Sequence, residues 1–195
     1  MSKGAQTREA ILSQALDQAS VQGLEGLSIG ALASRAGMSK SGLFAHFGSK
    51  EALQLAVLKA AARHFTDFVI APARREGSAL ARLRAFLERW LDWTEEGGLR
   101  GGCIFLSAAI EFDDREGPVR DYIATMQKNW VKTLAKTAER AVREGSLAPG
   151  LDCERFAHEV HGIYLAYHQA KRLLRDPGAR SRALRSLDSL IENAR

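Results

Sequence analysis

Several hydroxyl and basic side chains stand at predicted helix starts, a position that suits contact with phosphate. Ser28, Ser39 and Lys50 each occupy such a place, where free backbone N–H groups and the helix dipole attract anions. Lys40 follows Ser39 directly, and an ammonium group there can donate to guanine O6 or N7. These residue types at helix starts suit contact with an anionic partner.

Two short helices joined by a tight turn would hold these groups. The apolar spacing of residues 29–36 predicts the first helix, and Gly37 can adopt the positive φ that ends it. Ser39 can cap a second helix, over residues 40–47, by accepting from a backbone N–H. Helix, turn and helix form a helix-turn-helix, whose second helix reads the DNA major groove. The alternative is an ordinary helical hairpin inside a bundle.

The predicted second helix has an apolar side and a small, polar side. Leu43 and Phe47 are four residues apart, so both fall on one face and can anchor the helix to a core. Ser41 and Gly42 lie with Lys40 on the first turn, the part of a recognition helix that reaches base edges. Gly42 allows close approach but reads no base itself.

Residues 7–53 resemble the DNA-binding domain of the tetracycline-repressor (TetR) family of transcriptional regulators. The matching pieces are Arg8-Glu9-Ala10-Ile11-Leu12, Gly23-Leu24-Glu25-Gly26-Leu27-Ser28-Ile29, Ala33-x-x-Ala36-Gly37-Met38-Ser39 and Leu43-Phe44-x-His46-Phe47-x-Ser49-Lys50-Glu51. The resemblance implies a regulator that binds palindromic double-stranded operator DNA. It also implies a C-terminal domain that forms a homodimer and binds a small effector, which releases a repressor from its operator.

Two positions of the reading helix are interpreted through this resemblance. His46 resembles the histidine that the family uses near the DNA backbone, and the alternative is that it caps or packs locally. Phe44 departs from the pattern, because the family usually has tyrosine there. A hydroxyl contact to phosphate is therefore absent, and we expect Phe44 to keep only a packing role.

The composition is that of a folded protein with a mild excess of positive charge. The 195 residues carry a net charge of +5 with a pI near 9.5, which suits a polyanion but is equally common without one. No apolar run reaches the roughly 18–20 residues that span a bilayer, and the first residues lack a hydrophobic signal core. We therefore expect a cytoplasmic protein without a membrane partner, with Cys103 and Cys153 as free thiols.

Helical periodicity without any period-two segment predicts an all-α fold of about nine helices. Thr7 is predicted to cap the first helix, and a long continuous helix is predicted from Lys50 to near Pro72. The expected division is a DNA-binding domain over residues 1–50 and an effector-binding and dimerisation domain over residues 51–195.

The helices after residue 50 carry aromatic and apolar side chains that suit an apolar or aromatic ligand. The predicted ligand-binding residues are Phe65, Phe68, Trp90, Trp93, Phe105, Met126, Trp130, Tyr164, Tyr167 and His168. Plain core packing is the competing interpretation for each of them.

A dimer interface is predicted on the last two helices, because one of them is apolar on more than one side and the other has a narrow apolar seam. Two helices from each subunit would then form a four-helix interface. The residues assigned to it are Tyr164, Leu165, Leu184, Leu187 and Ile191.

Other functions find less support in the sequence. A helical small-molecule-binding enzyme is the alternative, but no nucleophile elbow, paired catalytic carboxylates or metal motif is visible, so no cofactor or metal is expected. A DNA-binding architectural protein would need a solid C-terminal core. The glycine-rich residues 98–103 lack the ending of a nucleotide-binding loop and suit a flexible connector. Cys103 suits a small buried hydrophobe better than a thiolate sensor.

Overall fold

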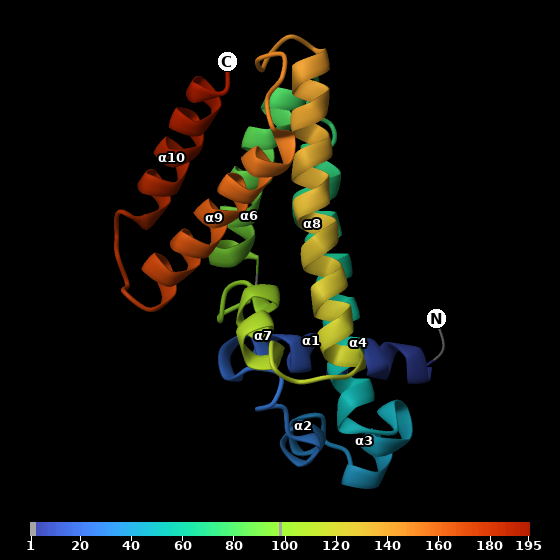
Figure 1. The fold of residues 1–195 in the computed structure, drawn as a ribbon. Helices are drawn as coiled ribbons and strands as arrows, with labels where there is room; N and C mark the ends of the chain where they lie inside the picture. Colours follow the sequence, from blue (N-terminus) through green and yellow to red (C-terminus); the bar gives the residue numbers. More distant parts are fainter. Residues whose placement is uncertain (1–2, 98) are drawn as a thin grey trace. The chain divides into compact units, whose positions relative to one another are not determined.

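The computed structural model describes residues 3–97 and 99–195, so Gly98 of the glycine-rich segment lies outside the described residues. The described chain is all-α, as predicted, and contains no strand (Figure 1). In chain order the helical segments are α1 (Lys3–Gln22), α2 (Ile29–Arg35), α3 (Lys40–Phe47), α4 (Lys50–Phe65), the π-helix η1 (Thr66–Ile70), α5 (Ala71–Ala73), α6 (Ala79–Glu96), α7 (Ile104–Phe112), α8 (Pro118–Arg143), α9 (Cys153–Arg172) and α10 (Ala179–Asn193).

The chain divides into two compact units, and each is assembled from two stretches of sequence. The first unit comprises Met1–Phe65 and Thr94–Thr125, and the second comprises Thr66–Trp93 and Met126–Arg195. The first unit therefore adds α7 and the first turns of α8 to the four N-terminal helices. The predicted functional boundary at residue 50 stays a prediction.

The core of the first unit is built on the apolar stripe of α1. Ile11, Leu12 and Ala15 are buried at helical spacing, and Leu43 of α3 is fully covered. The start of α1 differs from the prediction, because the helix already begins at Lys3. Thr7 is therefore inside α1 and does not cap it, since alanine and glutamine upstream are good helix formers.

The predicted long helix after Lys50 is interrupted by a π-helical turn. α4 ends at Phe65, the π-helix covers Thr66–Ile70, and a short α5 holds Pro72. Proline lacks the N–H that would bond to the carbonyl four residues earlier, and its ring crowds that carbonyl. A wider π turn just before Pro72 accommodates this defect, so the prediction of one regular helix was wrong in this stretch.

The second unit is held by α6, the larger part of α8, α9 and α10. Side chains cap the starts of α6 and α9: Ser78 Oγ accepts from the Ala81 N–H at 3.1 Å, and Asp152 Oδ1 accepts from the Arg155 N–H at 2.9 Å. The Glu144 carboxylate near the end of α8 accepts from the Ala79 N–H at 2.7 Å. This bond joins α8 to the start of α6.

The described part of the glycine-rich segment is anchored on α1, contrary to the expected flexible connector. The Gly101 N–H donates to Ser20 Oγ at 3.0 Å, and a Cβ at Gly101 would lie 1.5 Å from the Ser20 carbonyl oxygen. Arg100 pairs with Asp17 at 2.6 Å, and its hydrogen bond lowers the pKa of the Asp17 carboxyl group. Only glycine permits so close an approach of two backbones.

Candidate nucleic-acid interface and aromatic core

Two serine caps fix the starts of the helix-turn-helix, as the sequence predicts. Ser28 Oγ accepts from the Ala31 N–H at 3.4 Å at the start of α2. Ser39 Oγ accepts from the Gly42 N–H at 3.0 Å at the start of α3 and contacts Ser41 Oγ at 3.1 Å. The first turn of α3 is therefore rigidly held while it remains exposed.

The outer face of α3 combines basic, hydroxyl and apolar side chains. Lys40, Ser41 and Ala45 are exposed, whereas Leu43 is buried as an anchor. Phe44 belongs to the same outer face, because 51% of its surface is exposed. The expectation that Phe44 only packs was wrong. Phe44 follows the buried Leu43 directly in the helix, so its side chain points away from the core.

Lys40 lies beside the start of α2. A Cβ placed on Gly30 would lie 2.9 Å from Lys40 Cε, 3.6 Å from its ammonium nitrogen and 3.8 Å from Ser28 Oγ. An ammonium group, a hydroxyl group and a helix start thus gather at one exposed place, which suits an anionic oxygen. A base contact by Lys40 stays a prediction.

His46 lies on the last turn of α3, next to an aromatic neighbour. Its ring centroid is 6.4 Å from that of Phe47, and Arg8 lies over the Phe47 ring at 5.1 Å. His46 is only partly covered, so its side chain can combine local packing with contact to a partner.

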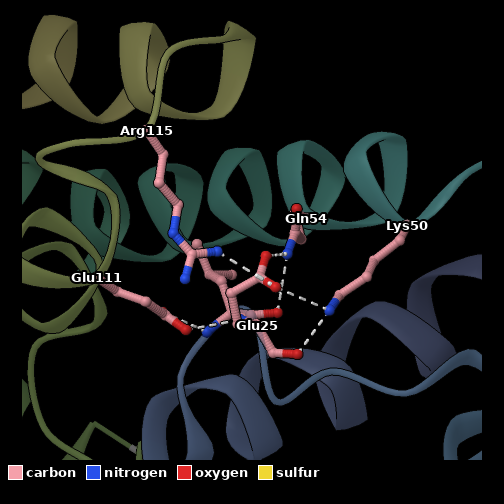
Figure 2. A network of polar contacts seen from close by, with 6 residues as sticks. Glu25, Lys50, Gln54, Glu111 and Arg115 are labelled. Atoms are coloured by element: carbon pink, nitrogen blue, oxygen red, sulfur yellow. Dashed lines mark hydrogen bonds and ion pairs between the residues drawn. The ribbon is translucent and has the colours of Figure 1, made fainter.

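Lys50 belongs to a polar network that residue spacing does not reveal (Figure 2). Its ammonium group donates to the Glu25 carbonyl at 2.7 Å and pairs with the Glu25 carboxylate at 3.2 Å. Gln54 also donates to that carboxylate at 2.9 Å. Hydrogen bonds from Gln54 and then from Lys50 lower the pKa of Glu25. The phosphate contact assigned to Lys50 stays a prediction and competes with these bonds.

The same network includes two residues far away in the sequence, Glu111 and Arg115. The Glu111 carboxylate accepts from the N–H groups of Leu24 and Glu25, and Arg115 lies 3.4 Å from the Glu25 carboxylate. Nothing in the spacing of these residues signals the contact, because it joins positions more than 80 residues apart.

An aromatic cluster forms the centre of the second unit, with rings from α6, α8 and α9. The Trp90 centroid lies 4.6 Å from that of Tyr164 and 5.5 Å from that of Tyr167, both with steep edge-to-face angles. Trp130 lies 5.4 Å from Phe86 and 5.7 Å from Tyr164. Four predicted ligand residues are thus brought together, and they pack directly against one another.

Three polar atoms of α9 are buried and have no hydrogen-bond partner among the described residues. They are the Tyr164 hydroxyl, His161 Nδ1 and His168 Nε2. Residues 161, 164 and 168 follow one another at helical spacing. Burial lowers the pKa of both histidines and raises that of Tyr164 far above its ordinary value. These shifts favour the neutral form of all three groups, which can exchange hydrogen bonds with an uncharged partner.

The remaining predicted ligand residues divide between the units. Trp93 is completely buried in the second unit, where Phe68 and Met126 are half-buried. Phe65 and Phe105 belong to the first unit, and their part in a common pocket stays a prediction. No group of three histidine, cysteine or acidic side chains in the described part of the chain is arranged to hold a metal ion.

The predicted dimer residues do not share one surface. Tyr164, Leu187 and Ile191 are at most 2% exposed within the single chain, so their side chains cannot face a second subunit. Leu165 is 48% exposed and Leu184 is half-buried. The assignment of these three residues to the dimer interface was therefore wrong. Leu187 and Ile191 of α10, like Tyr164 of α9, pack inside their own subunit.

A groove is lined by residues of α9 and α10, two helices that Figure 1 shows in orange and red. It encloses about 450 Å³. Its lining consists mostly of small and apolar residues: Glu159, Gly162, Ile163, Ala166, Tyr167, Ala170, Ala179, Arg182, Ala183 and Ser186.

Cys103 is 3% exposed and directly precedes α7, which agrees with the interpretation as a small buried hydrophobe. Cys153 is partly covered, and burial raises the pKa of its thiol. None of the described helices has the length and apolar character that crossing a membrane requires.

Known proteins resemble both parts of the chain. A structure of a TetR transcriptional regulator from Chloroflexus aurantiacus is 27% identical, with a TM-score of 0.90 over 98% of this chain and 97% of that one. The structure of AibR with isovaleryl coenzyme A and operator DNA is 25% identical, with a TM-score of 0.71 over 84% and 86% of the two chains. The regulator RutR of Escherichia coli K12 is 31% identical over 136 residues, which are 65% of this chain and 62% of the relative.

Two family descriptions match the sequence itself. Residues 11–57 match "Bacterial regulatory proteins, tetR family", and residues 79–187 match "Tetracyclin repressor-like, C-terminal domain". The first match contains the capped helix-turn-helix, and the second contains the aromatic cluster and the α9–α10 groove. The chain spans about three fifths of the curated relatives that it matches. Because family descriptions match both its N-terminal and its C-terminal part, the chain belongs to the tetR family of bacterial regulatory proteins.

Proposed function

We propose that the protein is a DNA-binding transcriptional repressor that an uncharged apolar or aromatic effector releases from a palindromic operator in the cytoplasm. The observation that carries the proposal is the exposed outer face of α3. Its first turn contains Lys40 and is held in place by the Ser39 cap. The test is selection of DNA from a random-sequence pool by the purified protein. Enrichment of a palindrome is the expected result, and a pool that stays random would contradict DNA reading.

Phe44 supports a specific expectation about that operator. An exposed phenyl ring on a reading helix suits the C5-methyl group of thymine, which lies in the major groove. We expect replacement of one contacted thymine by deoxyuridine to weaken binding about threefold, the loss of one buried methyl contact. The Phe44→Ala protein should bind the two DNAs equally. Fluorescence anisotropy at one ionic strength measures both affinities.

The control for this experiment is Val21→Ala, which removes another exposed apolar side chain outside α3. The Val21→Ala protein should keep the full preference for thymine. A Phe44→Ala protein that still distinguishes thymine from deoxyuridine would contradict the methyl contact.

The effector is expected at the aromatic cluster, because the buried Tyr164 hydroxyl has no partner there. An unpaired buried hydroxyl reduces stability, so Tyr164→Phe should raise the free energy of unfolding of the ligand-free protein by about 1 kcal/mol. Urea unfolding measures this change. The same variant should lose any small molecule that native mass spectrometry finds on the wild-type protein.

Tyr167→Phe is the matched control, since Tyr167 belongs to the same cluster but its hydroxyl is not among the unpaired atoms. We expect no gain in stability from that change. A Tyr164→Phe protein that is less stable than wild type would contradict an unsatisfied hydroxyl.

We also infer that the protein acts as a homodimer and without catalysis. Gly162 and Ala166 are small, exposed residues that line the α9–α10 groove, which allows helices of a second copy to approach. The family of regulators supports binding without turnover. Mass spectrometry should recover a bound small molecule unchanged after incubation, and a new product would overturn this inference.

A further inference from the structure

The loop between α1 and α2 is bonded to α7 through Glu111. One carboxylate oxygen accepts from the Leu24 N–H at 2.8 Å, and the other accepts from the Glu25 N–H at 2.7 Å (Figure 2). Hydrogen bonds to a carboxylate are stronger than bonds between neutral groups. Glu111 therefore satisfies two adjacent donors of the segment that leads into the helix-turn-helix.

Gly23 makes room for this carboxylate. Its φ is +79°, and a Cβ there would lie 2.7 Å and 2.9 Å from the two Glu111 oxygens. A side chain at this position would push Glu111 away from the loop, in addition to straining the backbone. The turn at the end of α1 and the acidic residue of α7 thus fit each other sterically.

The opposite side of the same loop is bonded to α4. Gln54 donates to the Leu24 carbonyl at 3.0 Å, and Lys50 donates to the Glu25 carbonyl at 2.7 Å. The two residues therefore offer their N–H groups to α7 and their carbonyl groups to α4. The direction in which the chain enters α2 is determined by both helices together.

We propose that Glu111 is a positioning residue for DNA reading: its contact with Leu24 and Glu25 sets the orientation of the helix-turn-helix relative to α7. A displacement of α7 would then change operator affinity without any change in the residues that touch DNA. The inference rests on the proposed operator binding and adds the means by which α7 controls it.

Two substitutions of Glu111 test separately whether its charge and its length are needed for the contact with Leu24 and Glu25. Glu111→Gln keeps the size but leaves a single acceptor oxygen, and Glu111→Asp keeps the charge but is one methylene too short to reach both donors. Each should weaken binding to the selected operator about tenfold, the size expected when charge-assisted hydrogen bonds are lost. Binding to random DNA should not change.

Glu116 provides matched controls, because it is an exposed glutamate five residues away. Glu116→Gln and Glu116→Asp make the same changes in charge and length, and both should bind the operator like wild type. Operator affinity that is equal in the Glu111 and Glu116 variants would overturn the proposal. An equal loss on operator and random DNA would overturn it as well.

Hydrogen exchange tests the contact without any DNA. The amides of Leu24 and Glu25, and those of α2, should exchange faster in both Glu111 variants than in both Glu116 variants. If the wild-type protein selects no operator, the proposed function fails, while the exchange measurement still decides whether Glu111 holds the loop and α2 in place. Unchanged exchange in α2 would overturn this inference.

Discussion

Replacing Gly101 by alanine is expected to lower the free energy of unfolding by about 3 kcal/mol or more. The added methyl group would lie 1.5 Å from the Ser20 carbonyl oxygen and 1.9 Å from its carbon. Those atoms belong to the backbone of α1 and cannot swing aside as the end of a flexible side chain would. The loop must therefore leave α1 and lose its bond to Ser20 Oγ. Urea unfolding followed by circular dichroism measures the loss.

Gly77→Ala is the control, because no atom of the described residues lies within 4 Å of a Cβ there and its φ lies outside the left-handed region. That change should alter stability by no more than about 0.5 kcal/mol. Equal unfolding midpoints for the two variants would show that the close approach at Gly101 does not limit stability.

The second large effect is expected from a charge in the α9–α10 groove. Ala166→Glu would bury a carboxylate in the interface with the second subunit, at a cost of about 3 kcal/mol, which raises the dimer dissociation constant roughly a hundredfold. Light scattering at micromolar concentration should then report a monomer. The helix content should stay that of the wild-type protein, because Ala166 is exposed in the single chain.

Two further variants show whether the effect belongs to the groove. Asn129→Glu adds the same charge to the exposed side of α8 and should leave the dimer intact. Leu187→Glu places the charge at a residue that is 2% exposed, so it should unfold the second unit instead of separating two folded subunits. A dimeric Ala166→Glu protein would locate the interface on another surface.

The sequence was sufficient wherever local chemistry determines the structure. The caps at Ser28 and Ser39 follow from residues within one turn of each helix start. Periodicity also identified the apolar side of α10, but it could not tell which surface covers that side. Leu187 was therefore assigned to a partner although it packs in its own chain.

Contacts between distant segments were beyond the sequence for a different reason. The bonds of Glu111 to the loop after α1 and the fit of Gly101 against Ser20 depend on how helices pack, and neither leaves a trace in residue spacing. For Phe44 the resemblance itself misled. A packing role was inferred from the missing hydroxyl, whereas the orientation of α3 turns the ring outward.

The division of each unit into two stretches of sequence affects the order in which a newly made chain can fold. Helices α1–α4 leave the ribosome first, but their unit also needs Thr94–Thr125. At about 5–20 residues per second, translation from residue 65 to residue 125 takes roughly 3–12 seconds. During this interval Leu24, Glu25 and Ser20 lack the partners that Glu111 and Gly101 supply. In a nascent chain, the first unit therefore cannot reach its final structure until more than half of the protein has been synthesised.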